Sequence, residues 1–418
     1  MFFFYQLINY ILIFISPVII LVRILRKKEH IFRFLEKFTV FTKKNTNGNI
    51  IWFHGASVGE IMSIIPLIEK YEKRRDISKI LVTSQTLSSS LILKKFNFKK
   101  TIHQFYPLDI NLFSKRFLNY WNPKIAIFID SEIWPAMFFQ IKRKSIPLIL
   151  LNARITNKSF KNWSKFIFFA KKIFQKIDMA YPQNYETYKY LKKLGPKKIK
   201  FIGNIKFAES ESEKKINLDS RLLKKIQKRK VWCASSTHET EEIICGKTHI
   251  KVRKKIKNLL TIIIPRHIQR VPKILEDLKN LGLNVCCHDS KKNISKSTDI
   301  YLVNTYGETK KFYKISETVL LGGSFINRGG QNPIEPARYG NKIIHGPYIK
   351  NFREVYSYLS KLRISSQVND YQKLQKKLGI LLKRKKLKNT SSKKLKIIGH
   401  KILYEYLNNI NKILKYEL

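Results

Sequence analysis

The sequence contains few cysteines, and their spacing matches no familiar structural framework. Only 4 of the 418 residues are cysteine, and two of them, Cys286 and Cys287, are adjacent. This spacing fits neither a metal site nor a set of disulfide bonds, so we expect reduced cysteines in the core of a cytosolic protein. The sequence also lacks zinc-finger spacing, an RNA-recognition signature and solenoid-type repeats.

Acidic residues are scarce as well. The chain has 29 Asp and Glu against 82 Lys and Arg, which gives a formal charge of +53. Such a charge implies a polyanionic partner: nucleic acid, an anionic membrane or a phosphorylated substrate. The lysines are spread along the chain among many Ile and Asn. This pattern is expected when the base composition of a genome biases codon choice, so the charge is weaker evidence for binding to nucleic acid. On charge alone, a non-catalytic protein that binds nucleic acid or membrane remains an alternative.

The first 28 residues predict a membrane anchor. Residues 2–25 are nearly all apolar and are followed at once by three basic residues, 26–28. About twenty apolar residues can span a bilayer, and basic residues after the run predict that the rest of the chain stays in the cytoplasm. A signal peptide would carry its basic residues before the apolar run. Because Pro17 interrupts the run, a shallower helix at the membrane interface is an alternative. A buried core helix is a further alternative.

From Asn49 onward, short β-branched runs alternate with amphipathic segments. This alternation predicts βαβ units and parallel sheets. In the first half we expect strands at 50–54, 80–83, 125–129, 147–151, 179–181 and 200–202. In the second half we expect strands at 231–234, 260–264, 283–286, 300–303, 319–321 and 342–344.

The length and one polar stretch predict two domains. An acidic and then basic segment with almost no apolar residues, 209–217, is the expected linker. It separates a first Rossmann-like domain, 29–208, from a second, 218–385, and residues 386–418 follow as C-terminal helices. Ligands of such doubly wound sheets bind beyond the carboxyl ends of the strands, so the residues at these strand exits are the candidates for function.

A glycine-rich stretch, Gly322–Glu335, stands between an apolar run and a segment that can be helical. Paired glycines let backbone amides approach a ligand, and a helix that begins near Asn332 or Pro333 adds further N–H donors, so the stretch predicts a cradle for a phosphate. Gly322, Gly323 and Ser324 would line that cradle, and Glu335 could accept hydrogen bonds from ribose hydroxyls. The alternative is a tight turn in which the glycines only permit positive φ.

Residues at three further strand exits in the second half are suited to bind anions. Residues 234–239 are expected to open a helix with hydroxyls that cap it or hold phosphate, and the Arg266 guanidinium suits bidentate phosphate binding. Tyr306, Gly307 and Glu308 are expected to begin another helix. Together with the glycine-rich stretch, these exits predict that the second domain binds a nucleotide.

The first half carries candidate catalytic residues at its strand exits. Ser57 and two glycines suit a close turn into a helix that places Glu60 in its first turn, as a general base or only as a helix cap. Asp130 and Glu132 follow the next apolar strand and resemble a short metal-binding pattern. Residues 152–154 form a third exit, and Lys206 could point into the cleft as a fixed cation.

In this order and spacing, the motifs resemble the 3-deoxy-D-manno-octulosonic acid (Kdo) transferase family. The segments that carry the resemblance are 54–60, 132–135, 152–154, 203–207, 236–239, 265–267 and 322–335. The resemblance implies a fold of the glycosyltransferase B type, with two Rossmann-like α/β domains facing a cleft. It also implies CMP-Kdo as donor, a phosphorylated lipid A precursor (lipid IVA) as acceptor, inversion at the anomeric carbon, and no metal or other cofactor.

The resemblance assigns roles residue by residue. Glu60 matches the family's general base, and Lys206 and Asp130 match positions that stabilise the transition state. Relatives usually have Glu at position 130 and His at position 331, where this chain has Asp130 and Gln331. The positions that match CMP-binding residues are Pro265, Arg266, Tyr306, Gly307, Glu308, Asn332, Pro333, Ile334 and Glu335.

The resemblance also explains the charge and the anchor. A phosphorylated glycolipid lies in an anionic leaflet, to which basic residues near a membrane are attracted. We therefore expect the chain at the inner membrane, with the basic face around 23–44 on the lipid and its catalytic part facing the cytoplasm. The resemblance implies that the last helices return to the first domain, and a solvated basic helix is the alternative for this tail. Another lipid glycosyltransferase of the same fold, with a different nucleotide sugar, is the alternative.

Overall fold

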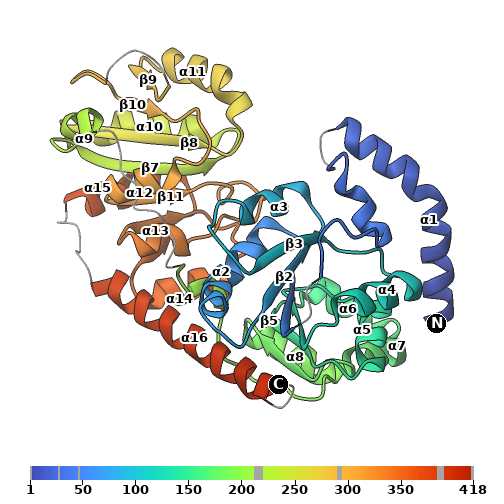
Figure 1. Ribbon diagram of the computed structural model, residues 1–418. Coiled ribbons are helices and arrows are strands. Elements are labelled where there is room, and N and C mark those ends of the chain that lie inside the picture. The colour runs from blue at the N-terminus through green and yellow to red at the C-terminus, as the bar shows by residue number, and fades with distance from the viewer. Residues whose placement is uncertain are drawn as a thin grey trace. The chain divides into compact units, whose positions relative to one another are not determined.

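The chain folds into two compact units (Figure 1). The computed structural model describes residues 2–26, 29–45, 48–210, 220–289, 294–383 and 390–415. Unit 1 comprises Met1–Glu213 and Ile398–Leu418, and unit 2 comprises Lys214–Ile397. Most of the predicted linker, 211–217, lies outside the described residues.

Unit 1 is built on a six-stranded parallel sheet with the order β3-β2-β1-β4-β5-β6. The strands are β1 (Ile50–His54), β2 (Lys79–Ser84), β3 (Thr101–Phe105), β4 (Ile125–Ile129), β5 (Leu148–Ala153) and β6 (Met179–Pro182). Every residue of β1, β4 and β5 is buried, because helices cover both faces of the sheet. The predicted doubly wound arrangement is therefore confirmed for this unit.

The helices of unit 1 follow the strands in alternation. They are α1 (Phe2–Leu25), α2 (Val58–Glu72), α3 (Leu87–Leu93), α4 (Asn111–Trp121), α5 (Pro135–Arg143), α6 (Asn157–Ser164), α7 (Ile167–Phe174) and α8 (Tyr185–Leu194), with short 3-10 helices η1 (Arg33–Phe38) and η2 (Ile205–Phe207). Aromatic side chains fill the space between sheet and helices. The Trp52 ring centroid lies 4.9 Å from that of Phe117 and 5.1 Å from that of Phe128. Such contacts add to the burial of large apolar side chains.

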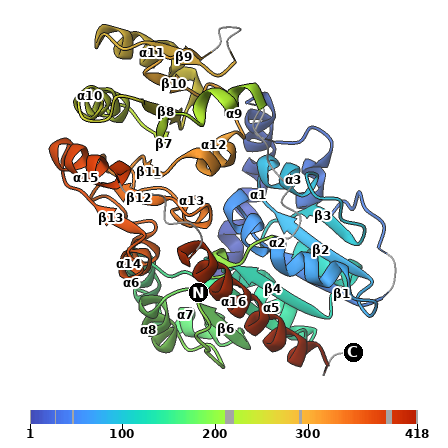
Figure 2. The same ribbon diagram turned by 90° about the vertical axis from the view of Figure 1, so that its left-hand side faces the viewer.

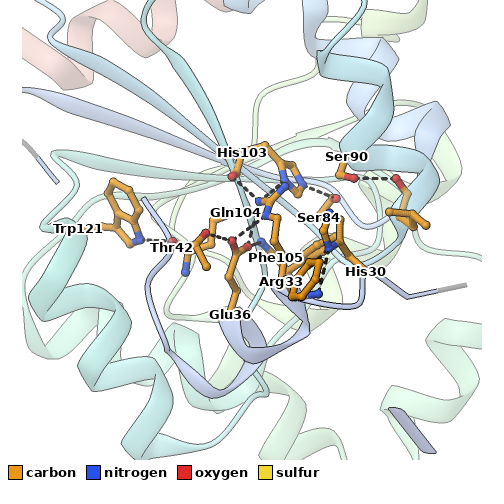
Figure 3. Close-up of polar contacts among 12 residues, drawn as sticks. His30, Arg33, Glu36, Thr42, Ser84, Ser90, His103, Gln104, Phe105 and Trp121 are labelled. Atoms are coloured by element: carbon orange, nitrogen blue, oxygen red, sulfur yellow. Dashed lines mark hydrogen bonds and ion pairs between the residues drawn. The ribbon is translucent and has the colours of Figure 1, made fainter. Parts of the chain in front are cut away.

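The edge of this sheet at β3 is covered by η1 (Figure 3). The buried carboxylate of Glu36 accepts the Phe105 N–H at 2.7 Å and two bonds from the Arg33 guanidinium at 2.8 and 3.0 Å. Arg33 also donates to the His103 carbonyl at 2.7 Å. Burial, and then the Arg33 charge, lower the pKa of His103 to about 3, so its imidazole is neutral. An open strand edge is thereby blocked by the chain itself.

Helix α1 is attached to unit 1 by polar side chains. The Tyr5 hydroxyl donates to the Asp109 carboxylate at 2.6 Å, and the Asn9 amide donates to the Asp109 carbonyl at 3.3 Å. The Gln6 amide oxygen accepts the Asn111 N–H at 3.0 Å. The polar residues that interrupt the apolar sequence of α1 therefore face the rest of the unit.

The other side of α1 is apolar and exposed. Its exposed residues are Leu7, Ile8, Tyr10, Ile11, Phe14, Ile15, Val18, Ile19, Leu21, Val22 and Leu25. The alternative of a buried core helix is therefore wrong. Among the described residues, no single helix has both the length and the hydropathy to cross a bilayer. The helical segments Tyr5–Ile11 and Ile13–Leu25, which are bent by 51° at their junction, meet both conditions when taken together.

Several basic residues in the last turn of α1 and after it form ion pairs within unit 1. The buried Glu29 carboxylate accepts bonds from Arg23 Nε at 3.0 Å and from Lys37 Nζ at 2.6 Å. Arg33 is paired with Glu36. Three of the six described basic residues in the face that the sequence predicted for the membrane, Arg23, Arg33 and Lys37, thus have acidic partners inside the protein. Arg26, Lys43 and Lys44 are exposed.

Unit 2 has a seven-stranded parallel sheet with the order β13-β12-β11-β7-β8-β10-β9. The strands are β7 (Lys230–Thr237), β8 (Leu259–Pro265), β9 (Val285–Cys287), β10 (Ile300–Leu302), β11 (Thr318–Leu321), β12 (Lys342–His345) and β13 (Ser365–Gln367). The helices are α9 (Ser220–Ile226), α10 (Glu241–Arg253), α11 (Val271–Asn280), α12 (Thr309–Ile315), α13 (Ile334–Arg338), α14 (Arg353–Lys361) and α15 (Tyr371–Lys383), with η3 (Ile268–Arg270). Helices α10 and α15 cover one face of the sheet, and α12 and α13 cover the other (Figure 2). The second predicted doubly wound sheet is confirmed.

One predicted strand does not form, and two observed strands were not predicted. Residues 200–202 are irregular, because pairing on that side ends with an isolated bridge between Ala180 and Ile199 before the chain turns at Gly203 (φ +125°). Strands β3 and β13 lie at sheet edges and have mainly polar sequences, so they lack the apolar runs that mark central strands.

The last helix, α16 (Thr390–Lys415), packs on unit 1 from Ile398 onward. The buried Tyr406 donates its hydroxyl hydrogen to the Gly203 carbonyl at 2.9 Å. A Cβ added at Gly399 would lie 2.2 Å from the Phe207 carbonyl oxygen, so glycine permits a close approach of this helix to η2. The helix therefore supports the loop that carries Lys206.

Candidate functional site

The strand exits of unit 1 bring several predicted residues together. Because β1, β4, β5 and β6 are parallel neighbours, their carboxyl ends meet at one edge of the sheet. The residues gathered there are His54, Glu60, Asp130, Glu132, Asn152 and Lys206. We call Glu60, Asp130, Asn152 and Lys206 the unit 1 site.

Glu60 lies in the first turn of α2 and forms a capping box with Ser57. Its carboxylate accepts the backbone N–H groups of Ala56 at 2.6 Å and Ser57 at 3.2 Å, and the Ser57 hydroxyl accepts the Glu60 N–H at 3.4 Å. The Ser57 side chain, predicted to contact substrate, thus caps the helix. Burial raises the pKa of Glu60 to about 7, with further contributions from the charges of Glu132 and Asp130. The capping interpretation therefore holds, and the same carboxylate is also suited to exchange protons near neutrality.

Asp130 and Lys206 form an ion pair. Lys206 Nζ donates to Asp130 Oδ2 at 3.0 Å, and the Asn152 side-chain amide donates to Asp130 Oδ1 at 2.6 Å. Asp130 is buried, and the backbone N–H of Lys206 is bound by the Asn204 side chain at 2.9 Å. The shorter side chain of aspartate, compared with the glutamate of the family pattern, therefore still reaches the lysine.

Sequence reasoning singled out the segments of His54 and Glu132 but missed that these two side chains contact each other at this edge of the sheet. Glu132 Oε2 accepts the Trp134 indole N–H at 2.9 Å and lies 3.2 Å from His54 Nε2. His54 is fully buried, and its Nδ1 lies 2.9 Å from the Thr83 hydroxyl. Burial lowers the pKa of His54 in spite of Glu132. A histidine at the end of a fully apolar strand was the available signal, because such a residue needs a polar partner.

The metal interpretation of Asp130 and Glu132 has no geometric support. Their carboxylates are bound to Lys206, Asn152 and Trp134. Among the described residues, no cluster of three or more His, Cys, Asp or Glu side chains is arranged to hold a metal ion.

In unit 2, the glycine-rich stretch already binds an anion, the carboxylate of Glu241. This carboxylate accepts the backbone N–H groups of Gly323 at 2.8 Å, Ser324 at 3.2 Å, Phe325 at 3.1 Å and His238 at 2.9 Å. Glu241 is fully buried, and burial raises its pKa although the four N–H bonds oppose the shift. The amides of Gly323 and Ser324 that the sequence predicted for a phosphate are therefore occupied by the chain itself.

The glycines and the serine of this stretch have structural tasks. A Cβ added at Gly322 would lie 2.3 Å from the Ser236 carbonyl oxygen, so only glycine fits there. The Gly322 N–H donates to the Ser235 carbonyl. The Ser324 hydroxyl accepts the Gly346 N–H at 2.9 Å. These contacts agree with the alternative interpretation of the glycine-rich stretch, in which it is a tight turn packed against the rest of unit 2.

One predicted helix start is displaced and another is confirmed. Strand β7 extends to Thr237 and α10 begins only at Glu241, so the hydroxyls of 235–237 belong to the strand instead of capping a helix. The helix expected to begin near Asn332 or Pro333 forms, with Pro333 as its N-cap and Ile334 as its first residue, although it is only five residues long. The Asn332 side chain accepts the Ile334 N–H at 3.1 Å.

The remaining predicted nucleotide-binding residues lie at the exits of the unit 2 strands. Pro265 ends β8 and is buried, whereas Arg266 is exposed. Tyr306 is 64% exposed, and Gly307 has φ +88°. Ion pairs join Glu308 to Lys311 at 2.6 Å and Glu335 to Lys310 at 3.5 Å. Pro333 and Ile334 are buried, and Asn332 is exposed.

A cluster of cations surrounds His238 in the same region. Burial lowers the pKa of His238, and the charges of His267, Arg328, Arg266 and Arg270 lower it further. A Cβ added at Gly323 would touch both His238 and Arg328, and the His238 and His267 ring centroids are 5.9 Å apart. Arg270 is neutralised by Glu242 at 3.0 and 3.1 Å. The surrounding positive charge can attract an anion to this part of unit 2.

Comparison with known proteins agrees with the sequence motifs. Residues 32–209 match the family model described as "3-Deoxy-D-manno-octulosonic-acid transferase (kdotransferase)". The chain is 32% identical over 413 residues to a 3-deoxy-D-manno-octulosonic acid transferase of Rickettsia bellii, with 98% of each chain covered. It is 28% identical over 375 residues to the transferase of the same name from Haemophilus influenzae, covering 87% of this chain and 85% of the relative.

A solved structure shares the fold. The UDP-GlcNAc 2-epimerase of Neisseria meningitidis has a TM-score of 0.59 and 14% sequence identity, and the match covers 87% of this chain and 100% of the epimerase. At this identity the likeness shows the fold alone. It agrees with two parallel α/β units of the glycosyltransferase B type.

Proposed function

The chain belongs to the 3-deoxy-D-manno-octulosonic acid transferase family, and we propose that it moves Kdo from CMP-Kdo to a lipid A precursor, lipid IVA, with inversion at the anomeric carbon. The observation that carries the proposal is the placement of Glu60, with a pKa of about 7, beside the Asp130–Lys206 ion pair. A base that exchanges protons near neutrality beside a fixed cation suits the transfer of a sugar to a hydroxyl group.

In the proposed reaction, Glu60 is the general base. Its carboxylate takes the proton of an acceptor hydroxyl while that oxygen forms a bond to the anomeric carbon of Kdo. The bond between this carbon and the phosphate oxygen of CMP breaks, and CMP leaves with the electron pair. The sugar carries positive charge as the bonds exchange, as in glycoside hydrolysis. The negative charges of Asp130 and Glu132 near Glu60 favour its proton uptake.

Lys206 supplies the cation of the proposed mechanism. Negative charge builds on the CMP phosphate as it departs, and a fixed ammonium group stabilises such charge without reorganisation. The bonds of Asp130 to Lys206 and to Asn152 support this role, because they hold the ammonium group in one place.

Unit 2 is proposed to bind the CMP part of the donor. The residues assigned are Pro265, Arg266, Tyr306, Gly307, Glu308, Asn332, Pro333, Ile334 and Glu335. The exposed Arg266 and the cations around His238 support a phosphate there. Gly322, Gly323 and Ser324 would act by shaping the loop, since Glu241 occupies the amides of the last two.

We further propose that the protein works at the cytoplasmic face of the inner membrane. The exposed apolar side of α1 and the exposed Arg26, Lys43 and Lys44 support attachment to an anionic lipid surface. Sedimentation with anionic vesicles tests this: removal of residues 1–28 should leave only weak, salt-sensitive binding, and unchanged binding at high salt would contradict it.

The activity is tested by mass spectrometry. A tetra-acylated lipid A precursor is incubated with CMP-Kdo and the detergent-solubilised protein, beside the Glu60→Gln variant. The acceptor should gain whole Kdo units with the unaltered protein only. No gain by a folded protein that CMP protects from heat would overturn the acceptor or the sugar, and protection by UDP or GDP but not CMP would indicate a different nucleotide sugar.

A further inference from the structure

Asn152 binds Asp130 and the residue that precedes Lys206. It is fully buried at the end of β5, and its side-chain nitrogen donates to Asp130 Oδ1 at 2.6 Å. Its side-chain oxygen accepts the N–H of Ile205, the residue before Lys206, at 3.0 Å. One amide group therefore holds the carboxylate directly and the lysine through its backbone.

The backbone of Asn152 indicates that its side chain is used. Its φ is +53°, and Asp130, its hydrogen-bond partner on the neighbouring strand, has φ +57°. Glycine adopts this conformation without strain, whereas residues with a side chain adopt it at a cost. Among residues with a side chain, Asn and Asp adopt it most readily, and here they occupy two adjoining strand exits with their side chains bound to each other.

The two bonds also fix the chemistry that position 152 requires. Ile205 N–H is a donor, so the group facing it must be an acceptor, and the ionised Asp130 oxygen requires a donor. A neutral amide supplies both on one short side chain. An ionised aspartate has only acceptors, and alanine or glycine has neither.

We propose that Asn152 is a positioning residue of the transfer reaction, which fixes the Asp130 carboxylate and the η2 loop so that Lys206 stays in place. This inference rests on the proposed function, in which Lys206 stabilises the departing phosphate. Asn152 itself has no contact with substrate in this proposal. Its removal should therefore slow the chemical step and leave substrate binding nearly unchanged.

The first test compares Asn152→Gly with Asn122→Gly. Asn122 also has positive φ, +41°, but it is exposed at the end of α4. Glycine is compatible with both backbones, so both variants should fold. Asn152→Gly leaves the buried Ile205 N–H without its acceptor and should melt at a lower temperature, so the kinetics are measured below the melting range of both variants. Asn152→Gly should lower kcat on the order of 100-fold, the cost of a small misplacement, with KM within about threefold, and Asn122→Gly should leave both unchanged. An unchanged kcat for Asn152→Gly would overturn the proposal.

The second test is the pH profile of Asn152→Asp. When protonated, this aspartic acid can donate to Asp130 and still accept from Ile205, as the amide does. When ionised, it repels Asp130. The ratio of variant to parental kcat should therefore rise as the pH falls, and a ratio that does not vary with pH would overturn the proposal.

A third measurement does not depend on transfer. The rate at which trinitrobenzenesulfonic acid modifies Lys206, followed by peptide mass spectrometry, should rise in Asn152→Gly and not in Asn122→Gly. Equal rates would overturn the positioning role. If the unaltered protein transfers no Kdo while Lys206 reacts faster in Asn152→Gly alone, the proposed function fails and the positioning of Lys206 by Asn152 stands.

Discussion

Two glutamates occupy matching places in the two units and have different tasks. Glu60 and Glu241 each lie in the first turn of the helix that follows the first strand of its sheet. Glu60 is half-buried and accepts two N–H bonds from its own turn. Glu241 is fully buried and accepts four, three of them from a loop more than eighty residues away. The same position thus carries the proposed general base in one unit and supports a loop in the other.

The surroundings of each carboxylate decide its task. Burial, and then the charges of Glu132 and Asp130, raise the pKa of Glu60 to about 7, so its proton is exchangeable at neutral pH. Burial raises the pKa of Glu241 as well, but its neighbours are backbone donors, which oppose this shift and cannot take part in proton transfer. A glutamate in a first helical turn therefore indicates function only when its neighbours are known.

Glu60→Gln should give the largest effect and separates the two roles most clearly. The amide still accepts the N–H groups of Ala56 and Ser57 but cannot take a proton, so transfer should fall by about 10³-fold, within the usual range for a general base. Initial rates of Kdo transfer measure this. A loss below about tenfold in a folded variant would show that Glu60 is only a cap, like Glu241.

Glu241→Ala should have the largest effect on stability. It leaves four buried N–H groups without their acceptor, so the free energy of unfolding should fall by about 3 kcal/mol, measured by urea denaturation. Glu239→Ala, at an exposed neighbour, is the control and should change it by less than about 0.5 kcal/mol. Equal changes in the two variants would show that the loop does not depend on Glu241.

The pH dependence gives a third test. The pKa of Glu60 is raised in the folded protein, so transfer should rise with pH and reach half its maximum at about pH 7. The same shift favours the protonated folded form, so folding stability should decline as the pH rises from the ordinary glutamate value toward 7, and Glu60→Gln should remove this decline. Glu132→Gln should move the midpoint of transfer to lower pH, and an unmoved midpoint would contradict the contribution of Glu132.

Thr240→Gly should have the smallest effect. Thr240 precedes Glu241 with φ +74°, which is strained for a β-branched residue. Glycine should remove this strain and raise the free energy of unfolding by about 1 kcal/mol, whereas Thr240→Ala keeps the Cβ and should not. Calorimetric melting of the two variants measures the difference, and equal stabilities would mean that the turn is not strained.

Much of the fold was predictable because buried parallel strands are continuous apolar runs. The central strands β1, β4, β8 and β11 follow this rule, whereas the polar sequences of β3 and β13 at the sheet edges do not. The gathering of Glu60, Asp130 and Asn152 followed from neighbouring strand exits, whereas the contact between Asp130 and Lys206 was not predicted, because Lys206 lies on η2 and the strand expected at 200–202 does not form. The binding of the Glu241 carboxylate to the glycine-rich stretch could not be predicted, because residues far apart in the sequence supply the carboxylate and three of the four amides.

The cover of the sheet edge by η1 has a practical consequence for shortening the chain. A truncation after residue 28 removes the apolar helix and keeps Arg33 and Glu36 on β3. A truncation after Thr42 would leave the Phe105 N–H and the His103 carbonyl without partners along an open strand. Such an edge is a template for pairing with another chain, so the longer truncation should yield aggregates where the shorter one yields a soluble protein.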